Sequence, residues 1–287
     1  MIRVRSMLYA LIKVWVPFCS VTTVFIITLF FLDNFLITNI ILFFMGNERK
    51  DILITLGEYL NTGVSFFLGI FLVLQLLNFF KKNNAGKVFN SHGNIYHDYS
   101  YATFFIAAKV LGYTKVQLAG IPIGMQYKLV LRGTFIDVVE DMWENHYIQA
   151  VSDENGKLPS NFIKVRKINF DDHYCNKINL IINDTCLILP KTIDKKYSDN
   201  ATICVDSTHT SGGHRYLNNY LVNRIRRVIQ KELPQEVEEI YIFSTANPKN
   251  NLNIITSCFR KFGRFQNQKV YVVQFDGKYY KKATRVI

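Results

Sequence analysis

The chain has 287 residues, a length typical of about two domains, and a net charge of +12. Its five cysteines have no paired spacing, which argues against a disulfide-stapled secreted fold and favours reduced thiols in a cytosolic compartment. Residues 1–80 hold five of the 34 basic and four of the 22 acidic side chains, so the remainder carries a net charge of +11. A basic soluble part favours an anionic partner, either lipid headgroups or a phosphate-bearing ligand.

The first apolar run extends from Val14 through Leu32, with Pro17 near its start. It lacks the short apolar region and the small-residue cleavage site of a secretory signal, so we expect a retained transmembrane helix. A second apolar piece, Phe35 to Met45, is too short to cross a bilayer. We expect it to lie at the far interface or to prolong a tilted helix.

The second span, Thr62 to Phe80, contains no charged residue and is closed by Lys81 and Lys82. At about 1.5 Å per residue its length approaches the ~30 Å hydrocarbon core of a bilayer. Basic residues are more frequent outside the two spans than in the loop between them, which predicts that both termini are cytoplasmic. Residues 1–82 are therefore expected to form a two-helix transmembrane anchor or effector.

One side of the second span carries small and amide side chains at helical spacing. The residues expected to pack against other helices are Asn61, Ser65, Gly69 and Gln75. Small residues let helix backbones approach closely in lipid, and amides hydrogen-bond across the contact. Two interpretations stay open, self-association of several anchors or packing against the first span of the same chain. Two spans cannot enclose a pore alone, so any pore would need several copies.

Residues 83–176 are predicted to form a first, mixed α/β part of the soluble region. After a polar linker, apolar residues at helical spacing predict a helix over Tyr96–Leu111, with Gly112 at the position of a C-cap glycine. Further on, the pattern predicts strands over 115–123 and 127–131, a helix over 135–145 and an exposed strand over 162–170. We assign no role to residues 95–176.

Residues 177–287 alternate between buried strands and helices. The predicted strands are Ile178–Ile182, Ala201–Val205, Glu239–Phe243 and Lys269–Phe275, and the predicted helices are Tyr216–Leu233 and Asn253–Phe262. Continuous apolar strands alternating with helices indicate a mostly parallel sheet covered on both faces, hence an α/β, Rossmann-like fold. Ligands of such sheets bind at the carboxyl ends of the strands.

Two loops follow strands at that edge. The first, Asp206 to Arg215, combines hydroxyl groups, a Gly-Gly pair and an arginine at the start of a helix, as an anion or phosphate site requires. The second, Ser244 to Asn251, supplies uncharged amides suited to the edge of a base or ribose. The alternative for both loops is an ordinary strand-to-helix turn with N-cap residues.

The first loop, with its TSGG sequence, resembles the ligand loop of CARF domains, and the stretch IYIFSTANP, a helix and VYVVQFDGKYY resemble the closing part of SAVED domains. Two N-terminal transmembrane helices followed by such a domain resemble the effectors of CBASS, the cyclic-oligonucleotide antiphage systems. The resemblance implies a bacterial inner-membrane protein with a cyclic oligonucleotide as ligand. The ligand-binding residues it implies are Ser207, Thr208, Thr210, Ser211, Gly212, Gly213, His214, Arg215, Ser244, Thr245, Asn247 and Asn251.

Chemistry beyond binding has little support. Cys204, His209 and His214 do not have a common zinc-site spacing, and Asp206 with His209 lacks a nucleophile elbow or a second carboxylate. The sequence has no P-loop and no GxGxxG motif. We expect no catalytic residue, no metal and no cofactor, so the chain is not expected to be an enzyme, although cleavage of a cyclic oligonucleotide stays open.

The resulting hypothesis is a membrane-anchored antiphage effector that senses a cyclic oligonucleotide. Ligand binding would favour a homo-oligomer whose anchors disrupt the lipid bilayer. The rival hypothesis is a constitutive anchor that recruits a protein or nucleic-acid partner through its basic surface. No stable nucleic-acid duplex is expected as a partner.

Overall fold

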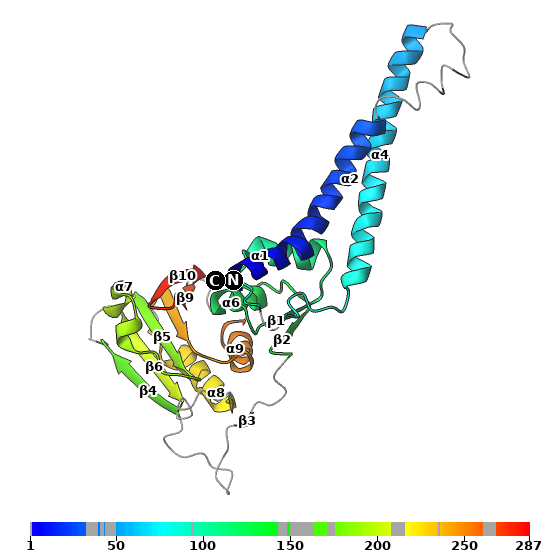
Figure 1. The fold of residues 1–287 in the computed structure, drawn as a ribbon. Helices are drawn as coiled ribbons and strands as arrows, with labels where there is room; N and C mark the ends of the chain where they lie inside the picture. Colours follow the sequence, from blue (N-terminus) through cyan, green and yellow to red (C-terminus); the bar gives the residue numbers. More distant parts are fainter. Residues whose placement is uncertain are drawn as a thin grey trace. The chain divides into compact units, whose positions relative to one another are not determined.

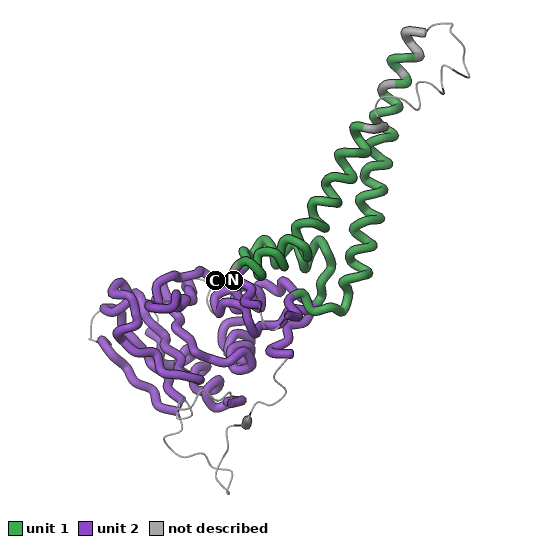
Figure 2. Tube along the Cα trace, in the orientation of Figure 1, with its two compact units in different colours: residues 1–89, 99–114 green, residues 90–98, 115–287 purple. Residues whose placement is uncertain are grey.

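The computed structural model describes residues 2–32, 40, 43, 50–92, 95–142, 148–149, 163–170, 176–207, 216–234, 236–260 and 268–287. The chain forms two compact units (Figure 2). The first unit joins residues 1–89 to 99–114, and the second joins residues 90–98 to 115–287. The loop predicted over 46–50, except Lys50, and most of the apolar piece 35–45 lie outside the described residues.

The first unit is built on a helical hairpin (Figure 1). α1 (Ile2–Ala10) continues through a π-helical turn, Leu11–Trp15, into α2 (Val16–Leu32), and α4 (Lys50–Asn84) packs along α2. Two segments, Val4–Phe30 and Tyr59–Asn84, are long and apolar enough to cross a membrane. Only 17% and 11% of their most apolar windows are buried, so the described part of the protein leaves most of this apolar surface uncovered. Both predicted spans are helices.

Small residues occur at every fourth position of α4 on its buried side. Gly57, Asn61, Ser65 and Gly69 are buried, whereas Gln75 is exposed. A Cβ atom added at Gly69 would lie 3.1 Å from Cδ2 of Phe25 in α2. Three of the four expected packing residues are therefore buried in the hairpin, with Gly69 directly against α2. Self-association through this face stays a prediction.

A short helix completes the first unit. α5 (Tyr101–Phe105) begins where the Ser100 side chain accepts a hydrogen bond from the Thr103 amide, and it ends in a π-helical turn, Ile106–Val110. The predicted start at Tyr96 is wrong because this cap fixes the helix start after residue 100. Gly112 has φ +82°, as expected for a C-cap glycine.

The second unit starts with a small parallel pair, β1 (Lys115–Gln117) and β2 (Asp137–Val139), connected through α6 (Ile123–Leu131). The predicted strand 127–131 is therefore wrong, and so is the predicted helix 135–145, which contains β2. Tyr127, Leu129 and Val130 are all buried, and a run of five residues is too short for its period to separate a strand from a buried helix.

The main sheet has six strands in the order β10-β9-β8-β5-β6-β4 (Figure 1). Their bounds are β4 (Ile163–Ile168), β5 (Lys177–Asn183), β6 (Ala201–Ser207), β8 (Glu239–Ser244), β9 (Lys269–Phe275) and β10 (Tyr280–Arg285). The four central strands are parallel, but β4 and β10 pair antiparallel at the two edges. The sheet is mixed, so the expectation of a mostly parallel sheet is wrong. At β10 the reason is the short turn after β9, which allows only an antiparallel return.

The remaining elements connect these strands. They are β3 (Ile148–Gln149), a 3₁₀ turn (Pro190–Thr192), α7 (Lys195–Ser198), β7 (Tyr216–Leu217), α8 (Asn219–Arg227) with a π-helical turn (Val228–Glu232), and α9 (Pro248–Ile254) with a π-helical turn (Ile255–Phe259). β7 pairs in parallel with β3, so the helix predicted from Tyr216 starts three residues later than expected. The helix predicted from Asn253 starts earlier, at Pro248.

The two faces of the main sheet are covered differently. Leu180, Ile203 and Ile242 point into a core shared with α6, α8 and α9. On the opposite face, which we call the open face, Ile181, Cys204 and Phe243 pack against Ile188 and Tyr197 of the connection 184–200. This connection joins β5 to β6 and contains the 3₁₀ turn Pro190–Thr192 and the short helix α7.

Candidate functional site at the carboxyl edge of the sheet

Parallel strands β5, β6 and β8 end at the same edge of the sheet, where ligands of such sheets bind. Polar side chains are buried together at this edge. We call them the edge network: Asn183, Asp184, Ser207, Asn218, Ser244, Asn247, Asn250 and Asn251. Five of them lie in the predicted ligand loops 206–215 and 244–251. The other three come from the end of β5 and the start of α8.

The second predicted loop is held by its own amides. Asn247 Oδ1 accepts a hydrogen bond from the Asn250 amide (2.9 Å) and so caps α9, while Asn247 Nδ2 donates to the Tyr216 carbonyl (2.9 Å). Asn250 Nδ2 donates to the same carbonyl (2.7 Å), and Asn251 Nδ2 donates to Gln126 Oε1 (2.6 Å). These amides are at most 3% exposed, so a ligand could reach them only by exchanging internal hydrogen bonds.

The hydroxyl groups of this loop tie β8 to the end of β5. Ser244 Oγ accepts from the Ala246 amide (3.1 Å). Thr245 Oγ1 accepts from the Asp184 amide (3.1 Å) and donates to the Cys186 carbonyl (2.7 Å). Ser244 and Thr245 therefore fix the turn that the two strands share.

Asp184 is the carboxylate of the edge network and is 3% exposed. Its Oδ2 accepts hydrogen bonds from Asn250 Nδ2 (2.8 Å) and from the Asn247 amide (3.1 Å). Burial raises the pKa of this carboxyl, and the two hydrogen bonds oppose that rise. Both partners stabilise the ionised form, so Asp184 joins the start of α9 to the end of β5.

The described residues on both sides of the first predicted loop are also fixed. Asn218 Nδ2 donates to Ser207 Oγ (3.1 Å), and Asn218 Oδ1 accepts from the Leu221 amide (3.0 Å), which caps α8. The Asn218 amide donates to Asn250 Oδ1 (2.9 Å). Seven of the predicted ligand-binding residues lie outside the described residues: Thr208, Thr210, Ser211, Gly212, Gly213, His214 and Arg215. The structure thus places the two ends of their loop on the edge network.

A charged pair lies beside the edge network. Asp206 Oδ2 accepts from Arg166 Nε (2.8 Å) and lies 2.7 Å from Arg166 Nη2, while Asp206 Oδ1 accepts from Asn183 Nδ2. The Arg166 side chain is 59% exposed and that of Asp206 only 13%. This arginine comes from an antiparallel edge strand and, because its partner is far away in the sequence, no local pattern pointed to it.

Within the described part of the chain, no group of three His, Cys, Asp or Glu side chains is placed to hold a metal ion. The two histidines weighed as ligands, His209 and His214, lie outside it. Cys204 lies in β6, and burial, followed by the nearby charge of Asp206, raises the pKa of its thiol. A thiol with a raised pKa is a poor nucleophile and a poor metal ligand at neutral pH.

Structure comparison finds receptors of limited similarity. One is the Cap4 SAVED/CARF-domain receptor of Acinetobacter baumannii with the cyclic trinucleotide 2'3'3'-cAAA, at a TM-score of 0.42 and 8% sequence identity. A second is the same receptor with 3'3'3'-cAAA, at a TM-score of 0.40 and 8% identity. Each match covers 64% of this chain and 41% of the receptor, so the chain spans about two fifths of the length of these receptors.

No curated protein sequence matches the chain. A family model does match, over residues 1–287, and its description is the SMODS- and ubiquitin-system-associated 2TM effector domain. The match includes both apolar helices and the whole second unit, which contains the main sheet and which we call the sheet unit. It confirms the resemblance to two-helix CBASS effectors, and the chain therefore belongs to this family of two-transmembrane-helix effectors.

Proposed function

We propose that this membrane effector senses a cyclic oligonucleotide at the carboxyl edge of its sheet, and that ligand binding drives oligomerisation and disruption of the bacterial inner membrane. The observation that carries the proposal is the family match over the whole chain, which joins the two apolar helices to the sheet unit in one effector. In this proposal the sheet unit acts as a Rossmann-like ligand-binding domain without enzymatic activity. Both chain termini lie on the cytoplasmic side.

The phosphates of the ligand bind the loop Thr208–Arg215. Its hydroxyls, its two glycines and Arg215 provide donors and positive charge, and α8 starts shortly after it. The fixed ends of this loop support the proposal, because Ser207 and Asn218 hold its two anchor points in the edge network. Preorganised anchor points lower the entropy lost when a loop closes on a ligand.

The anchors respond by assembling. Each chain contributes two mostly lipid-facing helices, and two helices cannot enclose a water-filled path. Several hairpins brought together by ligand-bound sheet units could do so. A ligand that binds the assembled state more tightly than the single chain shifts the equilibrium towards assembly.

The test uses the full chain reconstituted in liposomes that contain a self-quenched dye. We expect one member of a panel of cyclic di-, tri- and tetranucleotides to release the dye, and Arg215→Ala and Gly213→Asp to abolish the release. Arg227→Ala, at an exposed arginine of α8, is the matched control and should release dye normally. Release by no member of the panel would contradict the proposal and leave the constitutive anchor as the better explanation.

A further inference from the structure

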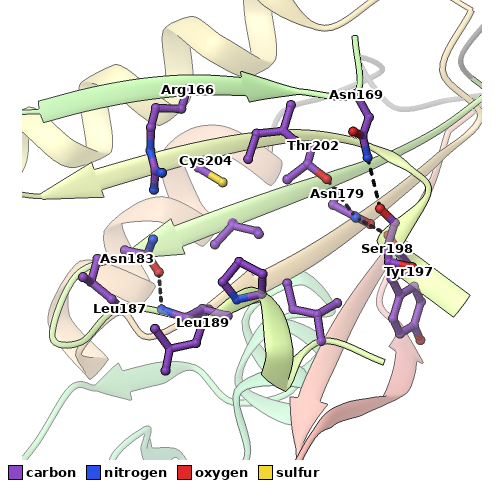
Figure 3. A pocket seen from close by; sticks show the side chains of 15 residues that line it. Arg166, Asn169, Asn179, Asn183, Leu187, Leu189, Tyr197, Ser198, Thr202 and Cys204 are labelled. Atoms are coloured by element: carbon purple, nitrogen blue, oxygen red, sulfur yellow. Dashed lines mark hydrogen bonds between the residues drawn. The ribbon is translucent and has the colours of Figure 1, made fainter. Parts of the chain in front are cut away.

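The open face of the sheet contains a pocket of about 380 Å³ (Figure 3). Its floor is formed by alternate residues of three strands, among them Ile181 of β5 and Thr202 and Cys204 of β6. Its wall is formed by Leu187, Ile188, Leu189 and Pro190 of the connection 184–200, together with Ile193 and Tyr197. The volume and the mostly apolar lining are those of a small-molecule site.

Polar groups lie at the two ends of this pocket (Figure 3). Asn183 and Arg166 lie near one end, and Asn169, Asn179 and Ser198 near the other. Asn183 Oδ1 accepts a hydrogen bond from the backbone N–H of Ile188 (2.9 Å), and Asn169 Nδ2 donates one to the Ser198 carbonyl (3.1 Å). These hydrogen bonds hold the wall of the pocket against its floor. The open volume is therefore a feature that the fold maintains.

The end near Asn183 carries excess positive charge. Lys164 lies directly across from Asp206 in the β4–β6 pairing, and Arg166 lies two residues further along the same face of β4. Asp206 forms its ion pair with Arg166, and Lys164 adds a second cation to this end of β4. The Arg166 guanidinium is mostly exposed and can turn to a second anion, and arginine binds phosphate in a two-pronged geometry.

We propose that the pocket receives a nucleobase whose attached phosphate binds Arg166. An apolar slot suits the two faces of a flat heteroaromatic ring, while the cations at one end suit the phosphate. The apolar lining alone would also suit a fatty acyl chain, so decanoate in the test below distinguishes the two ligands. The inference rests on the proposed function, since it assigns one base of the cyclic oligonucleotide to this pocket.

The same arrangement connects the pocket to the first ligand loop. Arg166 is bonded to Asp206, and the next residue, Ser207, is bonded to Asn218 in the edge network. A phosphate that takes Arg166 from Asp206 removes the main counter-charge of this carboxylate, two residues before Thr208. Base binding is thereby coupled through Asp206 to the end of β6, from which the first ligand loop continues.

The test measures binding of adenosine 5'-monophosphate, guanosine 5'-monophosphate, ribose 5-phosphate and decanoate to the full chain in lipid nanodiscs by saturation-transfer NMR. We expect at least one mononucleotide to receive saturation at its base protons, ribose 5-phosphate to bind at least tenfold more weakly, and decanoate not to displace the nucleotide. Displacement by decanoate would overturn the proposal and identify an acyl-chain pocket. Equal binding of ribose 5-phosphate would overturn the role of the base.

Two matched pairs of variants locate the binding. Cys204→Phe fills the floor of the pocket and should abolish mononucleotide binding, whereas Cys204→Ala leaves it open and should preserve binding. Arg166→Gln should weaken binding about tenfold, which corresponds to ~1.4 kcal/mol, and Arg227→Gln should not change it. Asp206→Asn removes the competing carboxylate and should strengthen binding. Unchanged affinity in both Cys204→Phe and Arg166→Gln would overturn the site.

The binding experiment and the dye-release experiment can contradict the pocket and the membrane function independently of each other. Mononucleotide binding to the pocket without dye release would count against the proposed membrane function and leave the pocket in place. Dye release by a cyclic oligonucleotide that is unaffected by Cys204→Phe would keep the proposed function and overturn the pocket as its base site.

Discussion

The edge network and the helical hairpin both bury polar side chains, but they use them differently. In the edge network each amide described above bonds to a strand end, a helix start or another amide, as Asn250 does with Asp184 and Asn218. In α4 of the hairpin two buried polar residues, Asn61 and Ser65, are four residues apart, and within the described part of the chain the Ser65 hydroxyl has no hydrogen-bond partner. Buried polar groups thus fix chain ends in the sheet unit, and they permit close helix approach in the hairpin.

The largest effect is expected from breaking the edge network at its centre. Asn250→Leu leaves the Asp184 carboxylate, the Asn218 amide and the Tyr216 carbonyl each short of a partner. Because unsatisfied buried groups retain their full desolvation cost, we expect a loss of about 3–5 kcal/mol. Hydrogen–deuterium exchange of peptides from β5 and β8 in the full chain measures this loss.

Asn223→Leu is the control for this change, because Asn223 is an exposed residue of α8. It should alter exchange in β5 and β8 by less than about 0.5 kcal/mol. If Asn250→Leu changed the exchange in β5 and β8 as little as the control does, the hydrogen bonds of the edge network would not stabilise the sheet.

The second effect concerns His97, a histidine of the sheet unit that is 1% exposed. Burial lowers its pKa from 6.5 to about 4. The unfolded chain therefore binds a proton at a higher pH than the folded protein does. As a result, the free energy of unfolding decreases as the pH falls from 6.5 to about 4. The loss is about 1.4 kcal/mol per pH unit, hence ~2 kcal/mol at pH 5. Denaturant unfolding at pH 7 and pH 5 measures it.

His97→Gln should remove most of this pH dependence. The charge of the exposed His92 side chain makes a smaller contribution to lowering the pKa of His97, so His92→Gln should retain most of the pH dependence. The pair distinguishes His97 from the carboxylates that also titrate in acid. An unchanged slope in His97→Gln would show that its pKa in the folded protein is close to the ordinary value.

The third effect tests close approach in the hairpin unit. Gly112 and Gly86 both have positive φ, +82° and +77°, but only at Gly112 does an added Cβ meet another chain segment, 2.6 Å from Cα of Lys81. Alanine at either position strains the backbone by about 1 kcal/mol. Gly112→Ala should cost a further 1–2 kcal/mol or so because backbone must move. Thermal unfolding in one detergent compares the two variants, and equal melting temperatures would contradict the steric explanation.

The sequence predicted the features that depend on short spacing. Gly112 was identified from the end of an apolar helical pattern, and the four parallel strands from continuous apolar runs. The run from Tyr127 to Leu131 was misread because five residues do not reveal a period. Asp184 was missed because its partner Asn250 is 66 residues away, and Arg166 because Asp206 is 40 residues away. Contacts of this kind depend on the fold, which no local pattern contains.

The smallest effect compares two glycines of α4. A Cβ at Gly63 meets nothing within 4 Å, whereas a Cβ at Gly69 lies 3.1 Å from Cδ2 of Phe25 and 3.6 Å from Cβ of Thr28. Gly63→Ala should stabilise the helix slightly, and Gly69→Ala should weaken the α2–α4 contact, a difference of about 1 kcal/mol. Thermal loss of helicity in detergent micelles measures it.

The same pair separates the two interpretations of the small-residue face. If the face serves packing within one chain, Gly69→Ala lowers the melting temperature of the hairpin, and any decrease in crosslinking between chains is secondary. If the face serves self-association, crosslinking between chains in liposomes falls in Gly69→Ala while the melting temperature matches that of Gly63→Ala. The 3.1 Å between a Cβ added at Gly69 and Cδ2 of Phe25 favours the first outcome, because a surface already covered by α2 has to open before a second chain can use it.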